Sequence, residues 1–140
     1  MAVFIPDASV VIPWCARDEA SAWTDGLLDR LRTGDSALVP PLWAYEVTNT
    51  LLHLQQRGRI VAADVVSFLD DLRALPIHVD ADGVERVFDR VAELAERCRI
   101  TVYDAAYLEL ALRTGYPLAT KDADLERAAG AEGAALVVKV

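Results

Sequence analysis

The sequence has little of what stabilises a secreted protein and little of what anchors one in a membrane. Only two cysteines occur among the 140 residues, Cys15 and Cys98, and neither belongs to a CxxC pair or a disulfide framework. No apolar run is long enough to span a bilayer, and no basic segment precedes the apolar residues 8–15 as in a signal peptide. We therefore expect a reduced, cytoplasmic protein with no membrane contact.

Positive charge is also scarce, because 14 Lys and Arg residues face 22 Asp and Glu residues and leave a net charge of −8. Such a balance argues against a protein that coats nucleic acid non-specifically. It is compatible with a nuclease, since an acidic site that holds divalent cations itself lowers the net charge. The two histidines, His53 and His78, are expected to be ordinary surface or loop residues rather than an acid–base pair.

Hydrophobic residues make up 54% of the chain, which is enough for one well-buried core at this length. Repeats, low-complexity tracts and linkers are absent, so residues 1–140 are expected to form a single domain. Short apolar runs predict strands at residues 3–5, 37–39, 76–79, 116–120 and 135–138. Amphipathic patterns and stop signals predict helices near residue 9 and at 18–32, 42–56, 62–72, 84–98, 103–113 and 122–129.

Strands that alternate with helices in this way predict an α/β domain whose central parallel sheet is covered on both faces. Two helices carry apolar stripes that predict their buried sides. In the helix at 42–56 the stripe consists of Trp43, Val47, Leu51 and Leu54. In the helix at 84–98 it consists of Val84, Val87, Phe88, Val91, Leu94 and Ala95.

Asp7 is the first charged residue of the chain and stands where the first strand ends. Pro6 removes a backbone donor and closes the strand. The crevice beyond the carboxyl ends of parallel strands is where open α/β sheets bind ligands, so a carboxylate there is placed for chemistry or for a metal. The alternative is that Asp7 caps a helix that begins near Ser9.

Asp104 opens a helix and lies on its apolar stripe, within roughly 40° of the directions of Leu108 and Ala111. A carboxylate on that stripe is desolvated unless a cation or a crevice compensates it. The alternative is a capping box in which Asp104 returns a hydrogen bond to Thr101. Aspartate is shorter than the usual Glu or Gln of that motif, which favours the functional interpretation.

Two further acids stand beyond other predicted strands. Glu46 follows the strand at 37–39 and the Pro40-Pro41 pair, and on its own it fits a solvated helix charge. Asp122 follows the strand at 116–120, beside Thr120, whereas Asp124 fits a first-turn acid that complements a helix dipole.

Asp7, Glu46, Asp104 and Asp122 together describe an oxygen-rich, anionic pocket at one edge of the sheet. Such a pocket prefers a hard cation, Mg²⁺ or Mn²⁺. Carboxylates gathered this closely repel one another, or shift their pKa values upward, unless an ion lies between them.

The segments around these acids resemble those of PIN-domain ribonucleases of the VapC toxin type. They are DASV at residues 7–10, VPPLWAYEVTN at 39–49, VYDAAYLELA at 102–111 and LATKDADL at 118–125. The resemblance covers essentially the whole chain in order and spacing. It implies a PIN-like three-layer α/β/α domain, Mg²⁺- or Mn²⁺-dependent cleavage of RNA, a cognate antitoxin that restrains the toxin, and a homodimer.

The same resemblance places catalysis and metal binding on Asp7, Glu46, Asp104 and Asp122. Thr120 matches a small hydroxyl position beside the fourth acid, and Ser9 of the first segment is expected to support the site with it. Lys121 lies outside the family's pattern. The bound cation or cations would activate a water and polarise the scissile phosphate for in-line attack.

Contacts to RNA and to the antitoxin follow from the same picture. Arg57, Arg59, Arg113 and Lys121 are candidates for phosphate contacts, with solvated helix ends as the alternative role for most of them. The acidic pocket would also accept an arginine from an antitoxin, which would displace the metal.

Three other functions compete with this interpretation. A receiver-type phosphoacceptor domain would use Asp7, Asp80 and Lys121 but leaves Glu46 and Asp104 unexplained. A non-catalytic interaction module predicts no RNA cleavage. A PIN nuclease that matures RNA, rather than acting as a toxin, has the same site.

Overall fold

The structure, a computed structural model, describes residues 1–139 and is built on four parallel strands. They lie in the order β3-β2-β1-β4, so β1 is flanked by β2 on one side and β4 on the other. The strands are β1 (Val3–Pro6), β2 (Ser36–Val39), β3 (Ile77–Val79) and β4 (Leu118–Ala119).

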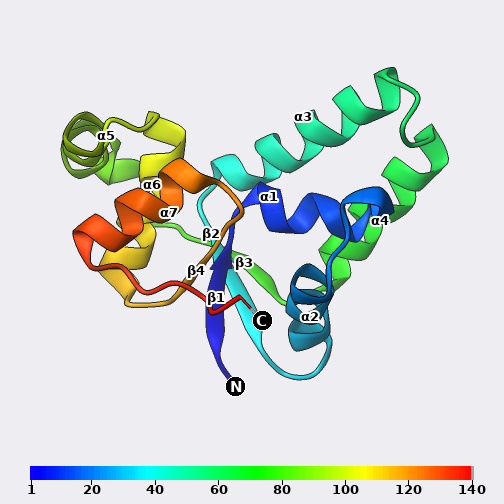
Figure 1. The fold of residues 1–140 in the computed structure, drawn as a ribbon, viewed down its shortest axis with the longest axis horizontal. Coiled ribbons are helices and arrows are strands. Elements are labelled where there is room, and N and C mark those ends of the chain that lie inside the picture. The colour runs from blue at the N-terminus through cyan, green and yellow to red at the C-terminus, as the bar shows by residue number, and fades with distance from the viewer. Residues whose placement is uncertain (140) are drawn as a thin grey trace.

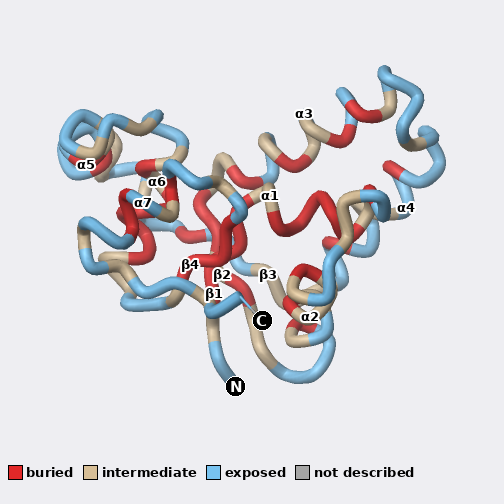
Figure 2. The backbone as a smooth tube through the Cα atoms, in the orientation of Figure 1, coloured by how far each residue is buried: buried red, intermediate tan, exposed pale blue. Residues whose placement is uncertain are grey.

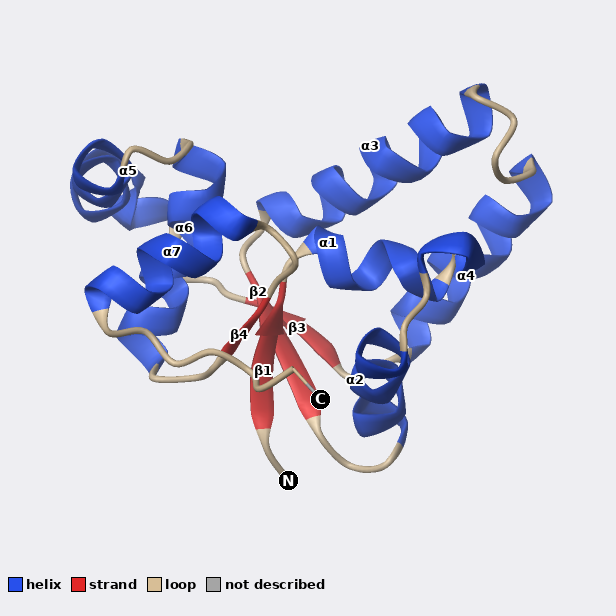
Figure 3. Ribbon diagram, viewed as in Figure 1, coloured by secondary structure: helices blue, strands red, loops and turns tan. Residues whose placement is uncertain are grey.

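Helices cover both faces of this sheet, and the predicted three-layer α/β/α architecture is confirmed (Figures 1 and 3). On one side lie α1 (Ala8–Val11), α2 (Ala22–Arg32), α3 (Leu42–Gln56) and α4 (Ala62–Ala74). On the other side lie α5 (Ala92–Cys98), α6 (Val102–Thr114) and α7 (Ala123–Glu132). Each connection therefore carries the chain from the carboxyl end of one strand, over a face of the sheet, to the amino end of the next.

The strands form the centre of the core (Figure 2). Phe4, Ile5, Val39 and Leu118 are fully buried, because both sides of a parallel sheet are covered and its strands need no polar face. Burying each such side chain stabilises the fold by about 1.5–3 kcal/mol. The short apolar runs of the sequence are thus the innermost layer of the protein.

Helix α3 begins and ends where the sequence predicts. Pro41 stands immediately before its first residue, where a missing N–H leaves no hydrogen bond unmade, and Gly58 follows its end with φ +72. The predicted stripe is confirmed, since all four of its side chains are buried: Trp43, Val47, Leu51 and Leu54.

The helix predicted at 18–32 is wrong in its first turn. Residues Arg17–Glu19 form a separate 3₁₀ turn, and α2 begins only at Ala22. The cause is a capping box, in which Ser21 Oγ accepts from Thr24 N at 3.1 Å and Thr24 Oγ1 accepts from Ser21 N at 3.1 Å. Threonine takes the place of the usual Glu or Gln, so the box is hard to recognise in the sequence.

The single helix predicted at 84–98 is also wrong. A 3₁₀ turn (Val84–Arg86) is followed by a π-helical turn (Val87–Val91) and only then by α5. A π turn holds more residues than an α turn, so the predicted stripe loses its phase before Val91. Val91 and Leu94 are buried, but Val84 is exposed and Phe88 is 98% exposed.

The strand predicted at 135–138 is reduced to one parallel bridge, between Leu118 and Leu136. Its partner β4 is only two residues long, which leaves little backbone to pair with. Both cysteines are free, as expected. No helix within residues 1–139 is both long enough and apolar enough to cross a membrane.

Candidate functional site

The candidate site lies where the order of the strands reverses. The chain builds β1, β2 and β3 outward in one direction and then places β4 on the opposite side of β1. Such a reversal opens a crevice between the carboxyl ends of β1 and β4. Asp7 follows β1 and Thr120 follows β4 there, and the Asp7 N–H donates to the Ala119 carbonyl at 3.1 Å.

Asp7 is the centre of a hydrogen-bond network that ties the two strand ends together. Its side chain is only 6% exposed. Oδ1 accepts from the Ser9 N–H at 3.0 Å and from the Ser9 hydroxyl, while Oδ2 accepts from the Thr120 hydroxyl. Asp7 therefore caps α1 and faces the crevice at the same time, so the two interpretations of this residue do not exclude each other.

Ser9 and Thr120 each also accept a hydrogen bond from the segment after β4. The Lys121 N–H donates to Ser9 Oγ at 2.8 Å, and the Asp122 N–H donates to Thr120 Oγ1 at 3.0 Å. Both hydroxyls thus bind Asp7 and hold the backbone that carries Asp122. This is a direct physical basis for the supporting role predicted for Ser9 and Thr120.

Glu46 lies on α3 and is held by a residue that the sequence reasoning missed. The hydroxyl of Tyr107, on α6, donates to Glu46 Oε1 at 2.6 Å. Tyr107 is 1% exposed, and its burial together with the charge of Glu46 raises its pKa far above the ordinary value. The hydroxyl stays protonated and acts as a permanent donor. The available signal was its spacing, since Tyr107 is three residues beyond Asp104 on the same helix face.

Asp104 lies at the start of α6, above the buried Leu108 and Ala111, as predicted. Thr101 Oγ1 accepts from the Asp104 N–H at 3.0 Å, which is one half of the alternative capping box. Within residues 1–139 no hydrogen bond runs from the Asp104 carboxylate back to Thr101 or to any other group. Its oxygens are consequently open toward the crevice side of the sheet.

The environment of Asp104 disfavours its charge. Burial, followed by the charges of Asp122, Asp7, Glu46 and, last, Asp124, raises the pKa of Asp104 to about 6. Repulsion reaches this carboxylate from three different elements of the fold, which places all four predicted acids in one electrostatic neighbourhood.

The pKa values of the other buried acids follow the same logic. Burial and the charge of Asp122 raise the pKa of Asp7, although hydrogen bonds from Ser9 and Thr120 oppose the rise. Burial raises the pKa of Glu46 as well, and the charge of Asp7 adds to it.

Asp122 caps α7, and Oδ1 accepts from the Asp124 and Leu125 N–H groups at 2.8 and 3.2 Å. Asp124 itself is exposed and pairs with Arg127 at 2.7 Å. Its predicted role as a surface helix acid is consistent with that position.

The charges of the four acids act on one another, but their side chains are not arranged around one point as the ligands of a single metal ion would be. No three His, Cys, Asp or Glu side chains within residues 1–139 are arranged to hold one metal ion. Many of the oxygens already accept hydrogen bonds, including both oxygens of Asp7, Oε1 of Glu46 and Oδ1 of Asp122. Both oxygens of Asp104 and the second oxygens of Glu46 and Asp122 have no such partner within this part of the chain.

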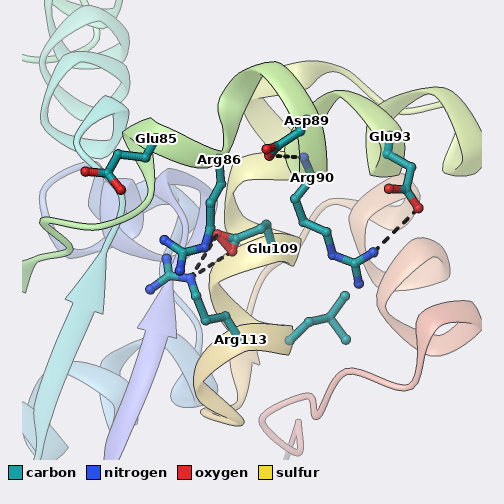
Figure 4. Close-up of a pocket in the computed structure, with 8 residues that line it drawn as sticks. Glu85, Arg86, Asp89, Arg90, Glu93, Glu109 and Arg113 are labelled. Atoms are coloured by element: carbon teal, nitrogen blue, oxygen red, sulfur yellow. Dashed lines mark hydrogen bonds and ion pairs between the residues drawn. The ribbon is translucent and has the colours of Figure 1, made fainter.

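A second buried charge cluster lies on the other side of α6. Arg113 donates to Asp80 Oδ2 at 2.6 Å and to both oxygens of Glu109 at 3.0 Å, and Glu109 is 3% exposed (Figure 4). Arg86 approaches Glu109 at 4.0 Å. Burial raises the pKa of Asp80, but the hydrogen bonds and charge of Arg113 outweigh it and leave this pKa below its usual value. An ion-paired Asp80 is not an open phosphoacceptor, which removes the basis of the receiver-type alternative.

Two cavities are lined by residues that neighbour the four acids in the chain. One of about 280 Å³ is mainly apolar and includes Tyr45 and Tyr103, the residues directly before Glu46 and Asp104. Another of about 300 Å³ lies between α1 and α3 and includes Ser9, Thr50 and Lys121. Neither cavity is lined by the four acids themselves; each is lined by residues that neighbour them.

The chain is similar in sequence and in fold to known proteins. It is 36% identical over 88 residues to the Ribonuclease VapC3 of Pyrobaculum aerophilum, a match that spans 60% of this chain and 64% of that protein. The crystal structure of PAE2754 from Pyrobaculum aerophilum superimposes with a TM-score of 0.67 and 25% identity, covering 91% of this chain and 87% of the other. The sequence pattern of the family described as "PIN domain" matches residues 4–131. The chain belongs to the PIN domain family.

Proposed function

We propose that this protein is a Mg²⁺- or Mn²⁺-dependent endoribonuclease and that Asp7, Glu46, Asp104 and Asp122 form its active site. The observation that carries the proposal is geometric: the Thr120 hydroxyl binds both Asp7 and the backbone of Asp122, while α6 begins with Asp104 and holds Glu46 through Tyr107. The raised pKa of Asp104, about 6, agrees with this arrangement. A fold that gathers four carboxylates at a ligand-binding crevice stores repulsion that a divalent cation relieves.

The donor set fits such a cation in its chemistry. Oxygen ligands from carboxylates are what Mg²⁺ and Mn²⁺ prefer. Asp104, Glu46 and Asp122 would hold the ion with the oxygens that accept no hydrogen bond, and Asp7 would complete the set. The ion, when bound, would supply a lower pKa for an attacking water and polarisation of the phosphate.

The chain's own residues do the remaining work. Ser9 and Thr120 fix the orientation of Asp7, as Tyr107 fixes that of Glu46, so that neither carboxylate needs to be ordered when RNA binds. Preorganised charges of this kind stabilise a developing transition state without reorganisation cost. No histidine is needed, and both His53 and His78 are exposed.

The biological role follows from the relative named as a VapC ribonuclease. We propose that residues 1–140 form a single domain that acts in the cytoplasm as the toxin of a toxin–antitoxin pair. Its partners would be an RNA substrate, a cognate antitoxin and a second copy of the chain. A nuclease that matures RNA would use the same site, and an antitoxin gene beside the toxin gene distinguishes the two roles.

The proposal is tested with purified protein and total RNA in the presence of Mn²⁺ or Mg²⁺. Wild type is expected to produce new RNA ends, and Asp104→Asn to produce at least 100-fold fewer, because loss of one metal-site carboxylate typically costs on this order or more. Asp29→Asn is the matched control, an exposed acid on α2 that pairs with Arg32, and should retain activity.

Identical RNA profiles for wild type and Asp104→Asn would contradict the proposal and favour a non-catalytic interaction module. Expression in cells gives the second readout. Wild type should arrest growth and Asp104→Asn should not, and co-expression of the antitoxin should restore growth.

A further inference from the structure

We propose that Lys121 binds an RNA phosphate next to the one that is cleaved, in the recess between α1 and α3. The inference rests on the proposed ribonuclease function, and it assigns a substrate-binding residue that lies outside the four-acid pattern. The carboxylates of the site repel the phosphates of RNA, so the protein needs positive charge beside the site to hold the strand.

The unpaired positive charges of the protein are few. Ten of its 14 Lys and Arg side chains form ion pairs with Asp or Glu. Within residues 1–139 the four that form none are Arg57, Arg73, Arg99 and Lys121. A surface cation that is already paired offers less to a phosphate, so these four are the first candidates.

Lys121 is the one of the four whose backbone is bound to the network around Asp7. Arg57 and Arg99 are the residues at the ends of α3 and α5, and Figure 1 shows the end of α3 projecting far from the strands. Arg73 lies in the last turn of α4, before β3, and therefore at the opposite edge of the sheet. Lys121 follows β4 directly and lies between Thr120 and Asp122.

The backbone of Lys121 is fixed while its side chain is exposed. Its N–H donates to Ser9 Oγ at 2.8 Å, and that hydroxyl in turn donates to Asp7. The Cα of Lys121 is therefore anchored to the same network that orients the catalytic acid. The ammonium group, which has no carboxylate partner within residues 1–139, is left to bind a ligand.

The recess that Lys121 borders suits a phosphate. Its volume is about 300 Å³, and its other lining residues are Ala8, Ser9, Ile12, Glu19 and Thr50. Thr50 is one turn beyond Glu46 on α3, so the recess continues from the acids along the same helix face. Glu19 is the one acid on its wall, and Arg59 pairs with it at 3.1 Å.

A phosphodiester chain is the occupant that this arrangement favours. The Lys121 ammonium and the Thr50 hydroxyl are donors for non-bridging oxygens, whereas the Ser9 hydroxyl already donates to Asp7. Ser9 and Lys121 lie next to Asp7 and Asp122 through the same hydrogen-bond network, so a phosphate in the recess would neighbour the one that is cleaved. An acidic protein segment could also pair with Lys121, but it has no phosphate for the neighbouring acids to cleave.

The test uses Asp104→Asn protein, so that RNA binds without being cut, and a short single-stranded, fluorescein-labelled oligoribonucleotide. Fluorescence anisotropy gives Kd over a series of KCl concentrations. Adding Lys121→Ala should weaken binding about fivefold to tenfold and reduce the slope of log Kd against log salt by about 0.7, the value for one phosphate contact on a single strand. Lys121→Arg should restore both values.

Arg73→Ala is the matched control, an unpaired cation at the opposite sheet edge, and should leave Kd and slope unchanged. In the active enzyme, Lys121→Ala should raise KM with little change in kcat. An unchanged salt slope in Lys121→Ala would overturn the assignment and, if wild type cleaves RNA, leave the nuclease proposal standing. Unchanged RNA binding with lost capture of the antitoxin would also overturn it and reassign Lys121 to a protein contact.

Discussion

Burial and repulsion from neighbouring acids act together on the Asp104 carboxylate. Its pKa rises from 3.8 to about 6 on folding, so the native protein binds a proton in this range that the unfolded chain has released. The free energy of unfolding therefore falls as the pH rises through the window from about 4 to about 6. Above that window the charged Asp104 destabilises the fold.

In EDTA at neutral pH, Asp104→Asn is expected to raise the free energy of unfolding, although the same change removes activity when Mn²⁺ or Mg²⁺ is present. In full, the rise in pKa corresponds to about 3 kcal/mol, and solvent screening of the partly exposed carboxylate reduces this to about 1 kcal/mol. At about pH 3 the difference should vanish, because the Asp104 carboxyl is then neutral in both the native and the unfolded state. Urea unfolding at the two pH values measures it, and an equal effect at both would contradict the electrostatic account.

Tyr107→Phe is expected to lower the free energy of unfolding by about 1.5–3 kcal/mol, the value of a hydrogen bond to a charged group. It should also raise the pKa of Glu46, because the hydroxyl that stabilises its charge is gone. The measurement is urea unfolding together with the pH–rate profile, whose acidic limb should move to higher pH. Tyr103→Phe, an exposed tyrosine on the same helix, should change neither.

Sequence reasoning predicted the four acids and the two hydroxyls that support Asp7, but it missed Tyr107, which supports Glu46, for a physical reason. A carboxylate directly after an apolar run signals a strand end, which is local information. The contact between Tyr107 and Glu46 joins residues 61 positions apart and depends on how α6 packs beside α3. No local pattern encodes that distance.

At the scale of elements, α6 has two functional sides. One side carries Asp104 and Tyr107 toward the acidic crevice, and the other carries Glu109 and Arg113, which are bound to Asp80 after β3. Gly83 leaves room for the Asp80 carboxylate in this ion pair, since a Cβ at residue 83 would lie 2.6 Å from Asp80 Oδ2. The buried ion pairs tie α6 to the sheet and so help to place Asp104.

Arg113→Met is expected to destabilise the protein by about 3–5 kcal/mol, because it leaves the buried carboxylates of Asp80 and Glu109 without a partner. Thermal unfolding followed by circular dichroism measures the loss. The triple change Arg113→Met, Asp80→Asn, Glu109→Gln should recover most of it, since no unpaired charge then remains. Arg127→Met, at an exposed ion pair, should have little effect; a similar loss there would contradict the role of burial.

The elements differ in how far their sequence determines them. Helix α3 is predicted to the residue because a proline stands before it, a glycine after it and one apolar period runs throughout. The segment 84–98 carries an equally clear period, yet a π turn changes its phase and leaves Phe88 exposed. The extra residue in that turn depends on tertiary packing, which a fixed period of 3.6 cannot represent.

At the scale of the whole molecule, the strands of the parallel sheet form the buried core, while the candidate functional residues lie at the carboxyl ends of the strands. Every strand points its carboxyl end to one edge, so residues that are distant in sequence collect there, and β1 and β4 open a crevice between them. The net charge of −8 is partly a consequence of this collection. The predicted three-layer fold follows from alternation alone, but the strand order that creates the crevice required the structure.

The most direct test of the shared cation site is Mn²⁺ binding measured by electron paramagnetic resonance, a readout independent of RNA cleavage. Wild type is expected to bind Mn²⁺, with Asp104→Asn weakening the affinity by about 10–100-fold and Asp29→Asn, an exposed acid on α2, leaving it unchanged. If wild type and Asp104→Asn bound Mn²⁺ equally, or neither bound it, the four acids would not form one metal site.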